Sequence, residues 1–384
     1  MDARAGARER FEAVRKTLIN LSHRIHAHPE LAFEEERAAG WCAEVLDGAG
    51  FAVERGVCDL PTAFIARAGS GPLHVAICAE YDSLPGIGHA CGHNVIAAMS
   101  VGAGIAAARV ADDVGLTVSV VGTPAEERGG GKIVLLERGA FAGVHAAIMA
   151  HPAPVDAVDP PTLAWSHFDV RYTGKSAHAS AFPERGINAA DALTVAQTAI
   201  GLLRQHIRQT DRVHGIVTDG GDAPNVVPAH SAATYIVRAR TLEELGDIQG
   251  KVLRCFEAGA LATGATLAVT PSGEPYAEVC HDPVLAGVYR RNAETLGRSF
   301  PDLGVLPERA AASTDMGNVS HALPSIHPLI GIDSLPAVNH QPEFAAHCVT
   351  PAADRAVVDG ALALAWTAID AALDPHLAGR LRRR

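Results

Sequence analysis

The sequence predicts an α/β protein in which a mostly parallel, helix-covered sheet is interrupted by a small α+β insert. In the first 150 residues, apolar segments of strand length alternate with segments of helical periodicity, and the alternation resumes after Pro271. This order is typical of parallel strands joined by crossover helices. The chain has 384 residues, which is long for one hydrophobic core, so we expect two domains.

The first half of the chain supplies most of the expected sheet. Apolar residues repeat at helical spacing from Phe11 to Ile25, which predicts a helix over residues 8–28 that ends before Pro29. Further helices are expected at residues 33–48, 93–109 and 131–138, and strands at residues 62–67, 73–79, 116–121 and 146–150.

The insert follows a stretch rich in proline and aspartate, Asp156 to Pro161, which is typical of a linker. The elements expected beyond it are strand 163–173, helix 186–209, strands 214–219 and 231–240, helix 241–262 and strand 265–270. Their β-α-β-β-α-β order is the ferredoxin-like split pattern. The α/β pattern of the first half then resumes, with a helix expected at 283–297, a strand at 325–332 and a helix at 351–373. We therefore predict a main domain of residues 1–160 and 274–384, and an insert of residues 161–273.

Bulk composition favours a soluble enzyme. The formal charge of −11 argues against a nucleic-acid-binding surface, and the only basic run, residues 380–384, is expected to be a solvated end. No apolar run reaches the ~20 residues of a membrane helix, and the N-terminus lacks the apolar segment of a secretion signal. Seven cysteines without framework spacing favour a reducing compartment, so we expect a cytoplasmic protein.

Four short runs carry candidate metal ligands, and three of them lie just after a predicted strand. The runs are residues 80–82, 89–93, 124–127 and 150–152, with a fifth candidate at 338–340. Carboxylates, imidazoles and one thiol at the carboxyl ends of parallel strands are the groups that a hydrolytic metal site uses.

Cys91 and His93 are separated by one glycine and lie where a helix is expected to begin. Glycines at positions 86, 88 and 92 allow this loop to wrap closely around a metal ion. A helix N-terminus also favours the thiolate that a metal needs. The alternative is a buried structural cysteine beside an ordinary core histidine.

Glu126 and Glu127 follow an apolar strand and precede three glycines. Neighbouring side chains allow one carboxylate to bind metal while the other faces the substrate, and a carboxylate beside activated water acts as general base and then as acid. The alternative is a solvated surface pair.

Three further residues complete the candidate set. His151 follows the strand expected at 146–150, and His340 precedes Gln341. Among 19 histidines, either one alone would be an ordinary structural residue. Asp82 follows the strand at 73–79 and is suited to hold a ligand imidazole in one tautomer.

Together these motifs resemble the M20 metallopeptidases. The resemblance rests on residues 80–94, 122–127, 150–152 and 340–344, and it extends to residues 28–30 and 313–315. The branch that it resembles includes aminobenzoyl-glutamate hydrolase subunits and the peptidase M20 domain-containing 2 dipeptidases. One departure is Asn94, where aminoacylase-like members carry aspartate, so the substrate preference of those members is not carried over.

The resemblance implies a catalytic main domain with two divalent metal ions and an inserted lid that forms a homodimer. The implied metal ligands are Cys91, His93, Glu127, His151 and His340. Glu126 would be the catalytic base. In the lid, His178 would bind the substrate or stabilise the oxyanion, and Asn225 and Arg238 would contact the substrate carboxylate. A turn role for Asn225 is the alternative.

We therefore expect a dinuclear, metal-dependent hydrolase that cleaves the amide bond of N-acyl or N-aroyl amino acids or small dipeptides. The thiol ligand suits zinc or cobalt, and the oxygen and nitrogen ligands also accept manganese. No nucleic-acid or membrane partner is expected. Two alternatives remain open, namely a cysteine-nucleophile amidase that uses Cys91 and a non-catalytic binding protein of the same fold.

Overall fold

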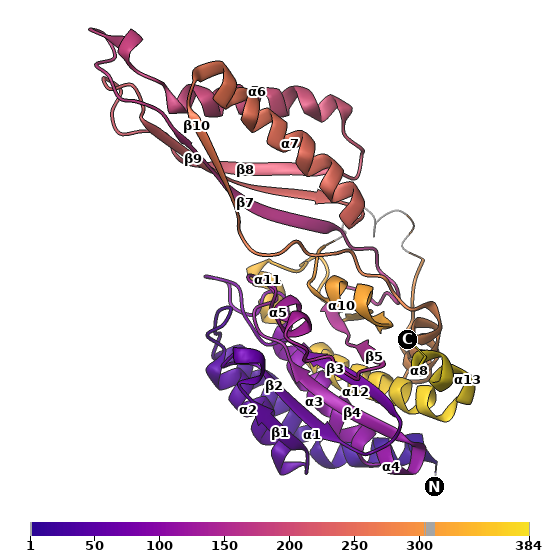
Figure 1. Ribbon diagram of the computed structural model, residues 1–384. Coiled ribbons are helices and arrows are strands. Elements are labelled where there is room, and N and C mark those ends of the chain that lie inside the picture. Colours follow the sequence, from indigo (N-terminus) through magenta and orange to yellow (C-terminus); the bar gives the residue numbers. More distant parts are fainter. Residues whose placement is uncertain (1, 303, 305–311, 384) are drawn as a thin grey trace. The chain divides into compact units, whose positions relative to one another are not determined.

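The computed structural model describes residues 2–302, 304 and 312–383 (Figure 1). The chain divides into two compact units. The first comprises Met1–Pro161 and Val279–Arg384, and the second comprises Thr162–Glu278.

The first unit contains a six-stranded sheet in the order β1-β2-β4-β3-β5-β11. Its strands are β1 (Ala52–Arg55), β2 (Phe64–Ala68), β3 (Leu73–Ala79), β4 (Leu116–Gly122), β5 (Ala146–Ile148) and β11 (Ser325–Ile326). The four strands from β4 to β11 are parallel, whereas β1 and β2 pair antiparallel at one edge. The expectation of a mostly parallel sheet is confirmed.

Helices cover both faces of this sheet (Figure 1). Val75 and Ile77 of β3 lie in one hydrophobic cluster with α1 (Ala3–Ala27), α2 (Glu36–Gly48), α3 (His93–Ala108), α8 (Pro283–Thr295) and α12 (Pro351–Leu373). Ala76 and Cys78 lie in another cluster with α5 (Gly131–Glu137) and α10 (Met316–Ala322). Successive strand residues therefore pack against opposite layers, as in a sheet that is buried on both sides.

The strand expected at 325–332 is instead two short strands in different sheets. β11 pairs with β5, and β12 (Leu329–Gly331) pairs with β6 (His151–Ala153) in a separate two-stranded sheet. Pro328 lies between β11 and β12, and proline has no N–H to continue a ladder. The remaining short elements of this unit are η1 (Val57–Asp59), α4 (Ala111–Val114), α11 (Pro342–His347) and α13 (Pro375–Leu381).

Helix α12 is long and apolar enough, by length and composition alone, to cross a membrane. The expectation that no segment reaches this threshold is therefore wrong. However, 78% of its apolar window is buried inside the fold, which is typical of the core helix of a globular protein.

The second unit is a four-stranded antiparallel sheet in the order β10-β7-β9-β8. Its strands are β7 (Ala164–Thr173), β8 (Arg212–Asp219), β9 (His230–Ala239) and β10 (Thr266–Pro271). Helices α6 (Ala189–Leu203) and α7 (Leu242–Thr263) pack with the sheet around one core. Two 3-10 turns, η2 (Pro183–Arg185) and η3 (Arg204–His206), complete the unit. The chain order matches the expected split pattern, although α6 is shorter than the helix expected at 186–209.

Close packing of α3 against the sheet predicts a strong effect of one added methyl group. A Cβ at Gly104 would lie 2.3 Å from Cγ2 of Val120, which is a stiff, fully buried side chain of β4. We expect Gly104→Ala to lower the free energy of unfolding by about 1–3 kcal/mol, as measured by urea denaturation.

Gly287→Ala is the matched control, because this α8 position faces only the flexible end of Arg291, at 3.7 Å. The control is expected to be neutral or stabilising, since alanine favours helix. Equal stability of the two variants would show that α3 has room to move away from β4.

Candidate metal centre

Four of the five candidate ligands lie in segments that follow β3, β4 and β5, and His340 lies between β12 and α11. Parallel strands end at the same edge of a sheet, so the segments that follow them converge. Helix α3 begins at His93, and Gly92 before it has a φ of 83°. A Cβ at Gly92 would lie 2.5 Å from Cγ of Pro152, so this close approach of two loops requires glycine.

The five residues expected to hold metal lie together. Sγ of Cys91 is 3.4 Å from Nε2 of His151, and Nε2 of His340 is 3.4 Å from Oε1 of Glu127. Nε2 of His93 is 3.9 Å from Oε1 of Glu127. Two groups of ligand atoms have all members within 4.8 Å of one another and share the thiol: Cys91, His93 and His151, and Cys91, Glu127 and His340.

Asp82 orients two of these ligands. Its Oδ1 lies 2.9 Å from Nδ1 of His93, and its Oδ2 accepts the backbone N–H of Glu127 at 2.9 Å. A proton on Nδ1 leaves Nε2 as the lone-pair nitrogen that a metal requires. The expected orienting contact of Asp82 is therefore present in the geometry.

The backbone turns the two neighbouring glutamates into the site. Ala125 has a φ of 59°, and its N–H donates to the buried Glu35 carboxylate at 2.8 Å. His340 also has a positive φ of 68°, and its N–H donates to the Ala90 carbonyl at 2.8 Å. Non-glycine residues in this region are strained and persist only when surrounding contacts hold them.

Several partners of the site have no metal-ligand signature in the sequence. Glu35 lies in a run of three glutamates, which is usually a solvated face, but it is fully buried. Lys132 is also fully buried and binds the carboxylates of Glu80 and Asp315. His327 follows β11, and its ring centroid is 5.6 Å from that of His151. The sequence offers no local signal for Glu35, whereas Lys132 follows a glycine-rich turn and His327 follows a short apolar strand.

The electrostatics of the cluster fit a bound cation. Burial, and then the Glu80 and Glu127 carboxylates, raise the pKa of Glu126 well above its usual value. Burial also raises the pKa of the Cys91 thiol, and the Glu127 carboxylate raises it further. Among the described residues, Nε2 of His93 and Oε1 of Glu127 have no hydrogen-bond partner although both are buried. Buried acids, a thiol and unpartnered ligand atoms are the donor set that a divalent metal satisfies.

The second unit holds the other predicted site residues. Nδ1 of His178 accepts the N–H groups of Ser180 and Ala181 at 3.3 and 3.2 Å, which leaves Nε2 as the protonated donor. The carbonyl of Asn225 accepts the Ala179 N–H at 3.0 Å, so the Asn225 loop and the His178 segment are neighbours.

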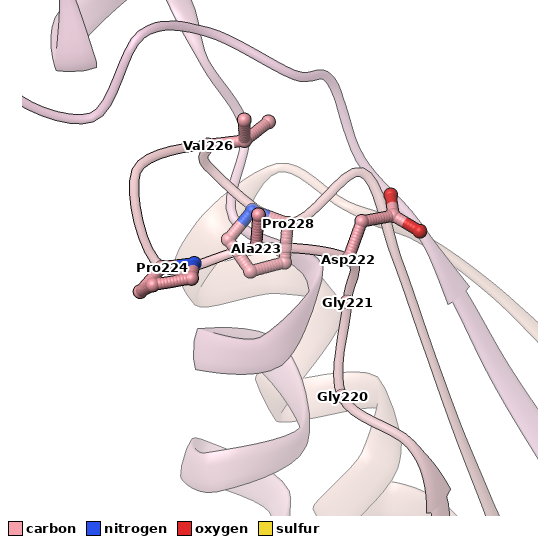
Figure 2. Close-up of a pocket in the computed structure, with 7 residues that line it drawn as sticks. All are labelled: Gly220, Gly221, Asp222, Ala223, Pro224, Val226 and Pro228. Atoms are coloured by element: carbon pink, nitrogen blue, oxygen red, sulfur yellow. The ribbon is translucent and has the colours of Figure 1, made fainter.

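This loop lines a pocket of about 320 Å³ between β8 and β9, formed by residues of Gly220–Pro228 (Figure 2). Arg238 lies elsewhere, near the opposite end of β9, where its guanidinium lies over the Trp165 ring at 5.4 Å. Within one unit, the structure therefore brings His178 and Asn225 together but not Arg238.

Fold and site together define a class of metal-dependent hydrolases, and comparisons with known proteins identify it. A family model described as the peptidase dimerisation domain matches residues 163–263. The Xaa-Arg dipeptidase of Mus musculus is 39% identical to this chain, and the match covers 98% of this chain and 90% of the mouse protein. The Xaa-Arg dipeptidase of Homo sapiens is 37% identical, and the match covers 94% of this chain and 87% of the human protein. One subunit of the p-aminobenzoyl-glutamate hydrolase of Escherichia coli is 35% identical over 67% of this chain and 58% of its own length.

Solved structures share the fold. A putative aminohydrolase from methicillin-resistant Staphylococcus aureus superposes with a TM-score of 0.77 at 22% identity, over 95% of this chain and 99% of that one. A Bacillus subtilis protein described as a dinuclear metal-binding peptidase from the M20 family superposes with a TM-score of 0.71 at 22% identity. This match covers 94% of the present chain and 98% of the Bacillus subtilis chain. The chain belongs to the M20 family of metallopeptidases and amidohydrolases.

Removal of the shared thiol tests the cluster. We expect Cys91→Ala to lose bound metal, because Cys91 belongs to both ligand groups. Elemental analysis of the purified protein measures this loss. Cys42→Ala is the control, since Cys42 is a fully buried core residue of α2. Full metal content in Cys91→Ala would remove Cys91 from the ligand set.

Proposed function

We propose that this protein hydrolyses an amide bond next to a free carboxylate, in small dipeptides and in N-acyl or N-aroyl amino acids. The observation that carries this proposal is the cluster of thiol, imidazole and carboxylate groups beside Glu126. The family includes both kinds of hydrolase among the relatives of this chain.

Two divalent metal ions would be held by Cys91, His93, Glu127, His151 and His340. When bound, such ions supply a water of lowered pKa and polarise the amide carbonyl. The thiol of Cys91 favours zinc or cobalt, whereas the carboxylate and imidazoles also accept manganese.

Glu126 would act as the base and then as the acid. Its Oε2 is 4.0 Å from Nε2 of His93, and the residue is 7% exposed. Glu126 therefore lies next to the candidate ligands, but it is a member of neither ligand group that contains Cys91. In this position it can accept the proton of the attacking water and deliver it to the departing amine nitrogen.

The insert would act as a lid and dimerisation domain. We propose a catalytic domain of residues 1–160 and 274–384 and a lid of 161–273, with hinges near 155–163 and 271–276. His178 would donate from Nε2 to the oxyanion, while Asn225 and Arg238 would contact the substrate carboxylate. Asn225 precedes β9, whose first residue is His230, and Arg238 lies about eight strand residues, roughly 26 Å, beyond His230. One small substrate would therefore need Asn225 and Arg238 from two protomers.

Dipeptides with a basic C-terminal residue are the first substrates to test. The relatives named Xaa-Arg dipeptidase match nearly the whole chain, whereas the p-aminobenzoyl-glutamate hydrolase relative matches two thirds of it. We further propose a cytoplasmic location, because all seven cysteines are free thiols.

The base assignment is tested by Glu126→Gln. We expect kcat to fall roughly 100- to 10,000-fold with metal content near normal, because the amide cannot accept the proton. Steady-state kinetics and elemental analysis provide the two measurements, and Glu12→Gln on exposed α1 surface is the control. A rate near wild type in Glu126→Gln would exclude this residue as the base.

Metal removal distinguishes the proposed metal-dependent hydrolase from a cysteine-nucleophile amidase and from a non-catalytic binding protein. Chelation should abolish hydrolysis of a panel of dipeptides, acyl-amino acids and aminobenzoyl-glutamate, and zinc, cobalt or manganese should restore it. We expect the highest kcat/KM for dipeptides ending in arginine. Activity that survives complete chelation would favour a cysteine nucleophile at Cys91, and silence across the panel with every metal would favour a non-catalytic binding protein.

A further inference from the structure

Lys132 is the only lysine among the described residues that is fully buried, and it lies beside the candidate metal centre. Its Nζ donates to Oε1 of Glu80 and, at 2.7 Å, to Oδ1 of Asp315. Its backbone N–H donates to Oδ2 of the same aspartate at 2.9 Å. Lys132 therefore binds both oxygens of Asp315 and connects the segment before α10 to the start of α5.

The two carboxylates bound by Lys132 flank Glu126. Carboxylate oxygens of Glu80, Glu126 and Asp315 all lie within 4.8 Å of one another, and all three residues are buried. Three acids at this spacing repel strongly in a dry interior and would rearrange without a cation among them. Lys132 supplies that positive charge.

The side chain of Lys132 is protonated and carries a positive charge. Burial alone would lower the pKa of its ammonium, but Asp315 and Glu80 raise it above the usual value. Lys132 is therefore an ammonium, and its Nζ lies within hydrogen-bonding distance of one carboxyl oxygen of Glu80 and one of Asp315.

The same network reaches the metal ligands. Oε2 of Glu80 has no hydrogen-bond partner among the described residues and lies 3.5 Å from Nε2 of His93. Because Lys132 holds the other oxygen of this carboxylate, Oε2 is fixed toward the imidazole.

We propose that Lys132 is a positioning residue, whose ammonium takes the place of a cation among three buried carboxylates and so keeps Glu126 in line with the attacking water. The proposal rests on the hydrolytic function proposed above. It assigns to Lys132 no contact with the substrate, so the lysine should affect the rate of the chemical step and not the binding of substrate.

The first test compares Lys132→Met with Lys251→Met. Methionine keeps most of the length without the charge, and Lys251 makes an exposed ion pair with Asp247 on α7. We expect kcat of Lys132→Met to fall at least about 100-fold, with KM within about threefold of wild type and metal content retained. A kcat equal to that of Lys251→Met, with the wild type active, would overturn this proposal and leave the hydrolytic function standing. An inactive wild type would instead overturn the hydrolytic function together with this proposal.

Chemical rescue tests the need for a cation. Lys132→Ala leaves space for a small ligand, so propylammonium should restore activity while propanol should not. Equal effects of the two compounds would contradict the proposal.

A triple variant covers the case in which single variants fold poorly. Glu80→Gln, Lys132→Met and Asp315→Asn together remove the buried charges while preserving shape, which is often tolerated. We expect a folded, metal-binding protein whose kcat is higher than that of Lys132→Met, because the two carboxylates that the ammonium balances are now neutral. A folded triple variant with a kcat no higher than that of Lys132→Met would contradict the charge-balancing role.

Discussion

Buried negative charge is the constraint on which the rest of this molecule depends. Glu80, Asp82, Glu126 and Glu127 follow two neighbouring strands and are at most slightly exposed. Unaccompanied carboxylates in such a place would take up protons or draw water into the fold. These carboxylates can therefore stay ionised and buried only if cations lie beside them. The chain provides one of these cations itself, the ammonium of Lys132.

The scaffold holds these groups by close backbone approach. Helix α3 is buried almost throughout, and its Gly102 and Gly104 face side chains of α1 and β4 at distances that exclude a Cβ. This packing fixes the helix start at His93 against the loop of Pro152. Ligands carried by rigid elements keep their geometry when a metal exchanges, which a loop alone would not ensure.

Much of this arrangement could be predicted from the sequence, because periodicity and motif spacing are local properties. The strand at 73–79 and the helix at 351–373 lie where the pattern placed them. The short β1 strand was missed because it is a largely exposed edge strand with no apolar alternation. Helices α10 and α11 have seven and six residues, too few for a helical period to be visible.

By itself, the sequence determined which chemical groups the chain carries and in what order they follow the strands, and hence the kind of site to expect. Only the tertiary structure decided their partners. Lys132 beside three glycines looks like an ordinary surface lysine, and its bond to Asp315 spans 183 positions. Such pairings depend on how helices and strands pack in space, which no local pattern of residues encodes.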